Sequence, residues 1–258
     1  WETEEIRVRA GQCLSVRVRG REWRLEVRYT VEEIRQILSY LANYSLYAYE
    51  GEIRQGYLTL PGGHRLGLVG RAVLEGDRIT SLTEISALNL RLAHEKKGCA
   101  DSVISCLWEQ DNLCDTLVVS PPGGGKTTLL RDCIRQISDG TKEHRGRTVG
   151  VVDERSEIAG CCRGVPENDV GMRTDVLDGC PKTLGMRMLL RSMAPEVLAV
   201  DEIGSEEDVR EIQYAANCGC TVFATVHGGS LDALQNQPNL RKLLETGAFQ
   251  RLLFLEGR

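Results

Sequence analysis

Hydrophobic positions in the first third of the chain occur in short runs that alternate with polar residues. Two runs, Ile6-Arg7-Val8-Arg9 and Val16-Arg17-Val18-Arg19, have a period of two, which predicts half-exposed strands. Leucine and isoleucine recur at helical spacing over residues 34–41, behind the suitable N-cap residue Thr30, so a helix is expected there. In the stretch 57–73, a Pro-Gly-Gly turn separates two apolar runs and predicts a hairpin.

The pattern changes near residue 96, where continuous apolar runs begin to alternate with helical patterns. Apolar runs of strand length occupy residues 117–119, 149–152, 197–200, 221–226 and 252–255. Helical patterns occupy residues 127–137, 181–193 and 206–217, with Pro181 expected in the first turn of its helix. Buried strands that alternate with helices indicate a parallel sheet covered on both faces. We therefore expect a small α+β domain in residues 1–95 and an α/β domain with a mostly parallel sheet in residues 96–258.

Charge and hydropathy argue against two classes of protein, those that coat nucleic acid and those that cross a membrane with apolar helices. The formal net charge of -5 disfavours a protein that coats nucleic acid by bulk electrostatics, but it leaves room for a local basic channel. No apolar run approaches the length of a transmembrane helix, and no signal peptide is visible. Because the chain begins with Trp1 and not with Met, we expect it to be a fragment or to lack an N-terminal segment.

The ten cysteines raise the question of disulfides or a metal site. None of them forms a Cys-x-x-Cys pair, and no histidine lies at metal-ligand spacing from a pair of cysteines. Cys133 falls on a helical face, and Cys218 and Cys220 lead into an apolar strand. We therefore expect small buried thiols in a reducing cytosol.

The run Ser120-Pro121-Pro122-Gly123-Gly124-Gly125-Lys126-Thr127-Thr128 carries the clearest chemical signal in the chain. It connects an apolar strand to a helix, whose N-terminus favours anions. Its glycines let backbone N–H groups converge on phosphate oxygens, Lys126 supplies a cation for the β- and γ-phosphates, and Thr127 supplies a hydroxyl for Mg²⁺. The context therefore predicts a Walker A loop that binds ATP and Mg²⁺, and not a Gly-rich turn without a ligand.

Ser120 departs from the GxxxxGK[ST] pattern of such loops, which has glycine at this position. Serine tolerates fewer backbone conformations than glycine does. We therefore expect Ser120 to alter the geometry of the loop without abolishing phosphate binding.

A second signal is the apolar strand Val197–Val200, which is followed directly by Asp201 and Glu202. An apolar strand that ends in two acids is the Walker B pattern, although such a carboxylate on its own often only caps a helix. Beside the phosphate-binding loop, Asp201 is expected to hold Mg²⁺ through water, and Glu202 to polarise the attacking water as general base. An acid at position 202 favours hydrolysis over binding alone.

Two other strands also end in polar residues. Asp153, Glu154 and Arg155 follow an apolar strand, and they form either a charged strand end with a local Asp-Arg pair or a cluster that serves Mg²⁺ and positions water. If they form such a cluster, Asp153 is expected to bind Mg²⁺, and Glu154 and Arg155 are expected to take part in catalysis. His227 ends another strand ahead of two glycines, where it is either structural or a sensor of the γ-phosphate.

In this order, the stretches 120–128, 153–157, 197–202 and 225–230 resemble the secretion-ATPase branch of the P-loop family. That branch includes type II and type IV secretion motors and type IV pilus ATPases, and it carries a Walker A loop, an Asp box, a Walker B strand and a His box in the same order. The stretch Leu190–Val197 is also similar to the segment that precedes Walker B in the family. The resemblance implies a RecA-like ATPase domain behind the smaller N-terminal domain.

A narrower resemblance is to the stage III sporulation AA family, and it covers nearly the whole chain. It rests on Asp153–Gly160, Asp175–Asp178, Cys180–Lys182, Arg191–Met193, Pro61–Arg65 and Ser45-Leu46-Tyr47-Ala48. It implies a cytoplasmic ATPase of the mother cell in an endospore-forming bacterium, docked at the membrane on proteins of the same operon. The enzyme would work as a hexameric ring that powers or gates the channel between mother cell and forespore.

The resemblance also implies that arginines of the N-terminal domain reach a nucleotide. Arg91, at the end of that domain, is the preferred candidate there, and Arg155 is a second one within the acidic cluster. Further candidates are Arg71, Arg78, Arg163, Arg173 and Arg191. An arginine in such a position contributes roughly 10³ to 10⁵ in rate.

Two other functions would use the same nucleotide site. A nucleic-acid translocase or helicase is disfavoured by the acidic balance and by the scarcity of aromatic residues, so no stable nucleic-acid partner is expected. A nucleotide-binding scaffold with little turnover would not need Glu202 as a base. The leading hypothesis is a mechanical ATPase that hydrolyses Mg-ATP.

Overall fold

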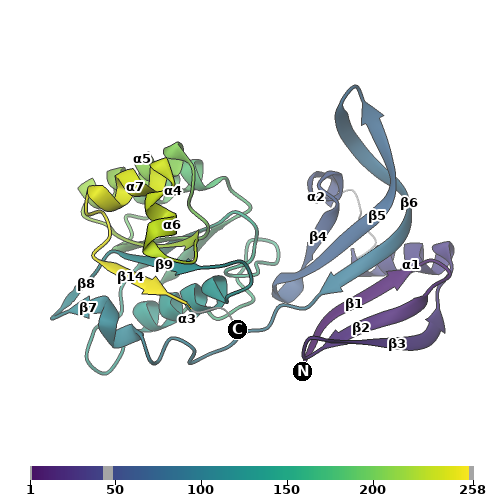
Figure 1. Cartoon of the computed structure of the whole chain (residues 1–258), viewed down its shortest axis with the longest axis horizontal. Helices are drawn as coiled ribbons and strands as arrows, with labels where there is room; N and C mark the ends of the chain where they lie inside the picture. The colour runs from purple at the N-terminus through teal and green to yellow at the C-terminus, as the bar shows by residue number, and fades with distance from the viewer. Residues whose placement is uncertain (1, 43–48, 256–258) are drawn as a thin grey trace. The chain divides into compact units, whose positions relative to one another are not determined.

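A computed structural model describes residues 2–42 and 49–255, which form two compact units divided between His94 and Glu95 (Figure 1). The division lies one residue from the boundary expected from the sequence. Each unit has its own hydrophobic core. Ser45–Ala48, which contributed to the narrower resemblance, lies outside the described residues.

The first unit is built on a six-stranded antiparallel sheet with the order β3-β2-β1-β6-β5-β4. Its strands are β1 (Thr3–Arg9), β2 (Cys13–Val18), β3 (Arg21–Arg28), β4 (Tyr57–Leu60), β5 (His64–Glu75) and β6 (Arg78–Arg91). The structure confirms the two period-two strands and the hairpin, whose strands β4 and β5 are joined by the 3-10 turn η2 (Pro61–Gly63). The sequence did not predict the edge strand β3, all of whose residues are exposed.

Helix α1 (Val31–Leu41) begins where the sequence predicts it. The Thr30 hydroxyl accepts a hydrogen bond from the Glu33 N–H, and the Thr30 N–H donates to the Glu33 carboxylate, so the two residues form a capping box. Ile34 and Leu38 of this helix are buried against leucines of the sheet. A short second helix, α2 (Glu50–Arg54), was not predicted.

The second unit contains a six-stranded parallel sheet with the order β11-β10-β12-β13-β9-β14, which confirms the predicted α/β class. Its strands are β9 (Thr116–Ser120), β10 (Val149–Asp153), β11 (Thr174–Asp178), β12 (Val197–Val200), β13 (Thr221–His227) and β14 (Arg251–Phe254). A turn of 3-10 helix, η3 (Ile104–Leu107), and a small hairpin of β7 (Trp108–Glu109) and β8 (Asn112–Leu113) precede β9.

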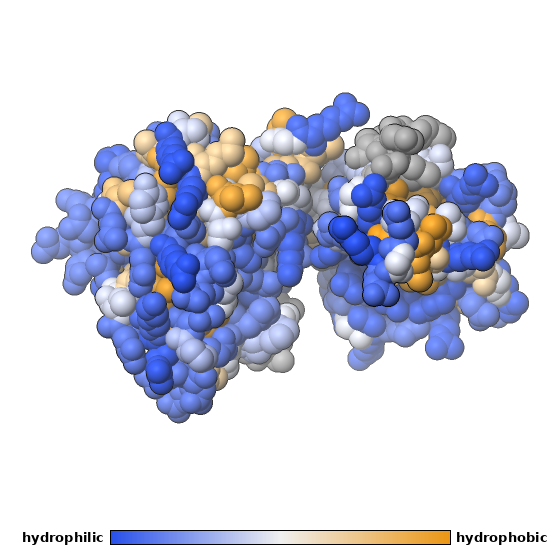
Figure 2. Space-filling model, turned by 90° about the horizontal axis from the view of Figure 1, so that it is seen from above, coloured by the Kyte–Doolittle hydropathy of each residue, from blue (hydrophilic) through white to orange (hydrophobic). Residues whose placement is uncertain are grey.

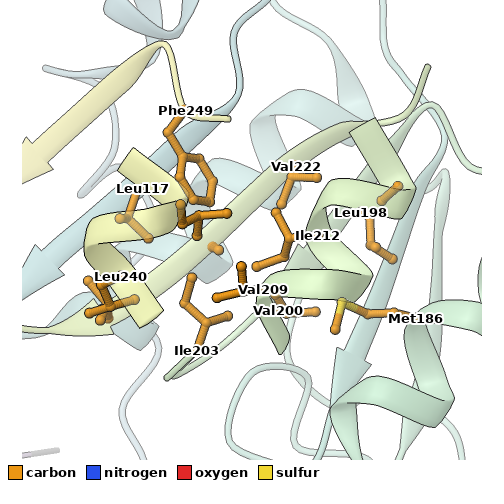
Figure 3. Packing of buried hydrophobic residues seen from close by; sticks show 14 of the residues in the cluster. Leu117, Met186, Leu198, Val200, Ile203, Val209, Ile212, Val222, Leu240 and Phe249 are labelled. Carbon is orange, nitrogen blue, oxygen red and sulfur yellow. The ribbon is translucent and has the colours of Figure 1, made fainter. Parts of the chain in front are cut away.

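Helices cover both faces of the parallel sheet. They are α3 (Lys126–Asp139), α4 (Lys182–Ser192), α5 (Glu206–Asn217), α6 (Leu231–Gln235) and α7 (Pro238–Glu245). On one face, Met186 of α4 and Ile212 of α5 pack with Leu198 of β12 (Figure 3). On the other, Leu130 and Ile134 of α3 pack with strand residues in a separate cluster. Two buried faces explain why the strands are continuous apolar runs.

Several element boundaries differ from those expected. Pro181 is the N-cap of α4 and not part of its first turn, because α4 begins at Lys182. The last strand begins and ends one residue earlier than expected, and α3 extends through Asp139. β11 has mostly half-buried residues, and α6 and α7 are short, so none of the three gave a clear sequence signal.

The ten cysteines are all free thiols, as expected, but only four of them are buried. Cys99, Cys106 and Cys218 are exposed, so the expected burial of the cysteines was partly wrong.

The visible surface of the molecule is mostly hydrophilic, with small hydrophobic areas between the charged ones (Figure 2). Within residues 2–42 and 49–255, no helix combines the length and the apolar character needed to cross a membrane.

Candidate functional site

The candidate site lies at the carboxyl edge of the parallel sheet in the second unit. Because neighbouring parallel strands end at the same edge, residues that follow β9, β10, β12 and β13 meet there although they are far apart in sequence. His227, at the end of β13, pairs in register with Ser120, at the end of β9. The sheet itself therefore brings the Walker A, Walker B, acidic and histidine stretches together.

The phosphate-binding loop leads from β9 into α3, so the predicted strand-loop-helix context is present. Gly123 and Gly125 have φ values of 76° and 88°, in the left-handed region that glycine adopts most readily. The Gly124 N–H donates to the Pro121 carbonyl at 3.1 Å and closes the turn. The glycines thus shape a loop at the N-terminus of a helix, where anions bind favourably.

Ser120 fits this loop without backbone strain. It is fully buried at the end of β9, and its backbone has no positive φ. Its Oγ donates to the Pro121 carbonyl at 2.9 Å. A Cβ atom added at Gly124 would lie only 2.0 Å from Ser120 Oγ. The Ser120 hydroxyl therefore fills the space that a side chain at position 124 would need, and the expected effect of Ser120 on the loop geometry stays a prediction.

Replacing Gly124 with alanine should weaken nucleotide binding about tenfold, which corresponds to about 1.4 kcal/mol. The new methyl group would collide with Ser120 Oγ, so the hydroxyl would have to rotate away and give up its hydrogen bond to the Pro121 carbonyl, which itself lies 3.2 Å from the added carbon. Gly124 has no positive φ, so the steric contact and not backbone strain is the cause. Titration with a fluorescent ADP analogue measures the effect. The double variant Ser120→Gly/Gly124→Ala should recover affinity to within about threefold of Ser120→Gly, and equal losses in both backgrounds would refute the explanation.

Thr127 and Asp201 form the part of the site that suits a metal ion. Thr127 Oγ1 donates to Asp201 Oδ2 at 2.6 Å, and the Thr225 hydroxyl donates to the other Asp201 oxygen. A hydroxyl and a carboxylate are hard oxygen donors of the kind that Mg²⁺ prefers, and Mg²⁺ usually completes its coordination with water and substrate phosphates. The residues therefore fit the predicted ion. Thr225 begins the stretch that resembles the His box, but its contact with Asp201 was not predicted, because a threonine inside an apolar strand is not a distinctive signal.

Glu202 is the centre of a charged cluster. Its Oε1 lies 2.9 Å from both Lys126 Nζ and His227 Nε2, and its Oε2 lies 2.9 Å from an Arg155 guanidinium nitrogen. Lys126 and His227 are themselves 3.3 Å apart. The structure therefore brings four of the predicted catalytic residues into contact.

The surroundings of Glu202 favour its ionised form. Burial alone would raise the pKa of this carboxyl group, but the hydrogen bond from Lys126 and the nearby charges of Lys126, Arg155 and His227 outweigh it. The pKa of Glu202 is therefore held below its ordinary value. An ionised carboxylate is the form that can accept a proton from water.

Asp153 has a role that the sequence did not reveal. One of its oxygens accepts the Glu157 N–H at 2.9 Å, and the other accepts those of Ile158 and Ala159 at 3.0 and 2.8 Å. Burial is the main cause that raises the pKa of this carboxyl group. Asp153 therefore fixes the loop after β10, because both of its oxygens accept backbone N–H groups of that loop. Its expected metal role stays an untested prediction.

Arg131 of α3 fixes the same loop from the other side. This buried side chain donates to the Ile158 carbonyl and, at 2.6 Å, to the Glu157 carbonyl. The sequence gave no reason to single out Arg131 among the residues of an amphipathic helix. The loop after β10 is therefore anchored by Asp153 and by Arg131, and the choice between a structural and a catalytic role for its acidic residues stays a prediction.

Glu154 contacts a lysine that was not among the predicted site residues. Lys182 Nζ, at the start of α4, lies 3.0 Å from Glu154 Oε2 and also donates to the Glu202 carbonyl at 3.0 Å. A cavity of about 20 Å³ lies beside this contact. Its lining consists of Val152, Asp153, Glu154, Arg155, Glu157, Lys182, Asp201 and Glu202. The acidic loop and the Walker B end therefore share one small polar space.

Arg91 lies at the end of β6 in the first unit, where it is exposed and pairs in register with Glu5. Its expected contact with a nucleotide stays a prediction. Of the other arginine candidates, Arg173 donates to the Ser138 carbonyl at 2.9 Å, so part of its donor capacity is used in holding the end of α3.

Comparison with known proteins identifies a family whose members this chain resembles along nearly its whole length. Residues 2–258 match the family described as "Sporulation stage III, protein AA". The "Stage III sporulation protein AA" of Bacillus subtilis (strain 168) is 44% identical over 254 residues, which cover 98% of this chain and 82% of the relative.

Solved structures of an ATPase and of a pilus retraction motor share the fold. The Legionella pneumophila ATPase DotB superposes with a TM-score of 0.62 at 18% identity, over 94% of this chain and 65% of the DotB chain, just under two thirds of its length. The pilus retraction motor PilT, determined with bound ADP, superposes with a TM-score of 0.67 at 19% identity, over 98% of this chain and 74% of the PilT chain. At these identities the similarity concerns the fold.

Proposed function

The chain belongs to the sporulation stage III protein AA family, and on this basis we propose that it is a motor ATPase that hydrolyses Mg-ATP. One observation carries the proposal. Lys126 and Thr127 of the phosphate-binding loop lie within hydrogen-bond distance of Glu202 and Asp201, respectively. A cation for phosphate, a hydroxyl and carboxylate for Mg²⁺, and an ionised base thus occupy one edge of the sheet.

The loop is proposed to bind the phosphates of ATP. Its backbone N–H groups and the N-terminus of α3 would face the phosphate oxygens, and Lys126 would turn from Glu202 towards the β- and γ-phosphates. Thr127 and Asp201 would hold Mg²⁺, which when bound neutralises charge on the phosphates. The binding of the triphosphate would therefore compete directly with the Lys126–Glu202 ion pair.

Glu202 would then act as the general base. Its carboxylate takes a proton from a water molecule whose oxygen attacks the γ-phosphorus, while the bond between the γ-phosphorus and the bridging oxygen of ADP breaks. His227, 2.9 Å from Glu202 Oε1, would orient the carboxylate and report on the γ-phosphate. Arg155 would stabilise charge on the phosphates after leaving Glu202, and Arg91 would contribute from an N-terminal domain.

The work done by this ATPase is proposed to serve the channel that joins mother cell and forespore. The family name and the fold shared with a pilus retraction motor support this proposal. The enzyme would be a hexameric ring in the mother-cell cytoplasm, bound to the membrane through channel proteins of the same operon. A nucleic-acid translocase is the second candidate, and the net charge of -5 weighs against it.

The purified protein should hydrolyse ATP, lose this activity in excess EDTA, and respond less than about twofold to single-stranded DNA. Magnesium removal should act through Thr127 and Asp201, because the phosphates would lose their counter-ion. A coupled assay of phosphate release measures all three results. Stimulation of several-fold by DNA would favour the translocase, and a strict monomer in light scattering with ATP at every concentration would contradict the ring.

A further inference from the structure

Glu202 has an unusual backbone conformation for the general base of the proposed reaction. Its φ is 54°, in the left-handed region that residues other than glycine seldom adopt. Such a conformation persists only where the surrounding structure enforces it. The contacts that hold the peptide groups of Glu202 therefore decide where its carboxylate points.

Three hydrogen bonds fix this part of the backbone. The Glu202 N–H donates to Thr225 Oγ1 at 2.9 Å, and the Ile203 N–H donates to the Thr225 carbonyl at 2.9 Å, so β13 holds one side. On the other side, the Glu202 carbonyl accepts from Lys182 Nζ at 3.0 Å. The peptide group between Glu202 and Ile203 is therefore held at both ends. Its N–H is bonded to β13, and its carbonyl is bonded to the side chain of Lys182.

Lys182 is itself held in place. Its side chain is 17% exposed and contacts Glu154 Oε2 at 3.0 Å. The helix that carries it lies close against the sheet, since a Cβ atom at Gly185 would be 2.5 Å from a Val152 methyl group. The ammonium group therefore bridges the acidic loop after β10 and the end of β12.

We infer that Lys182 is a positioning residue, which holds Glu202 in its left-handed conformation and ties it to Glu154. The inference rests on the proposed ATPase function. The contacts of the Glu202 carboxylate with Lys126 and Arg155 must change when phosphates enter, because both cations are then attracted to the nucleotide. The contact of Lys182 is with the backbone, so it can persist through the catalytic cycle and keep the base aligned with water.

Lys182→Met should lower kcat about 100-fold, near the lower limit of what a positioned general base contributes. The KM for ATP and the affinity for a fluorescent ADP analogue should change less than threefold, because Lys182 acts on Glu202 and not on the phosphates. Lys182→Arg, which keeps a cationic donor, should recover kcat to within about fivefold of wild type. Lys242→Met, which removes an exposed lysine from α7, is the matched control and should leave both quantities unchanged.

A second measurement separates positioning from general damage. In the Glu202→Gln background, Lys182→Met should reduce the residual turnover less than twofold, since the residue through which it acts is already lost. A full additional loss there would overturn the inference, as would wild-type kcat in the single variant. A more than tenfold weaker affinity for nucleotide would assign Lys182 to phosphate binding instead.

Crystal structures test the inference without any turnover. Glu202 should keep its positive φ in the wild-type protein and leave that region in Lys182→Met. A positive φ in both proteins would overturn the role of Lys182, whatever the activity. If the wild type keeps the conformation, the variant loses it, and neither hydrolyses ATP, the proposed function fails while the positioning role of Lys182 stands.

Discussion

Glu202→Gln should lower the turnover of ATP about a thousandfold, while affinity for the nucleotide changes less than about threefold. The amide has nearly the same shape as the carboxylate but cannot take a proton from water. Lys126 would lose an ionic partner at 2.9 Å, which frees its ammonium group for phosphate and protects binding. Steady-state phosphate release and titration with a fluorescent ADP analogue give the two quantities.

The control for this experiment is Glu143→Gln, which removes an exposed carboxylate from the loop before β10 and should have no effect. Turnover within tenfold of wild type in Glu202→Gln would mean that another group activates the water. Glu154 would then be the next residue to replace, because its carboxylate lines the same cavity. Turnover by the wild type that disappears in Glu202→Gln would also exclude a scaffold that only binds nucleotide.

Lys126→Ala should weaken nucleotide binding at least about 100-fold and abolish measurable turnover. Lys126 is the cation of the phosphate-binding loop, and its side chain is only 7% exposed, so its charge acts on the phosphates with little screening by water. Calorimetric titration with ADP and with a non-hydrolysable ATP analogue measures the loss.

Protein stability should change little in Lys126→Ala, because Glu202 keeps its contacts with Arg155 and His227. Thermal unfolding without nucleotide checks this point, and Lys142→Ala, an exposed lysine in the loop before β10, is the matched control. Binding within about fivefold of wild type in a folded Lys126→Ala protein would show that the loop does not hold phosphate in the proposed manner.

The sequence predicted best the elements that are buried on both faces or that carry a strong cap. The strand Val197–Val200 and the helix Glu206–Asn217 have the bounds that were expected. The strand is apolar throughout, and the helix directly follows its capping residue Ser205. β3 was missed, although its Trp23, Leu25 and Val27 alternate with charged residues as in a strand. It lies at the edge of the sheet with all of its residues exposed, so no burial supports this weak period-two signal.

The candidate site was predictable where it depends on motifs and strand ends. Lys126, Thr127, Asp201, Glu202 and His227 come together because parallel strands end at one edge. The roles of Asp153 and Lys182 were not predictable, because each depends on which backbone groups a side chain meets in the folded chain. The oligomeric state, the cellular location and the contact of Arg91 stay predictions.

The fit between Ser120 and Gly124 also restricts how this loop can change over evolutionary time. A lineage that acquires a side chain at position 124 while keeping Ser120 passes through a protein with a steric clash. The new Cβ atom would lie 2.0 Å from Ser120 Oγ. A lineage that first replaces Ser120 with glycine meets a smaller barrier, because the close contact with Ser120 is gone and the one with the Pro121 carbonyl, at 3.2 Å, remains. The order of the two mutations is therefore constrained, and a serine at 120 together with any residue larger than glycine at 124 should be rare among descendants of this protein.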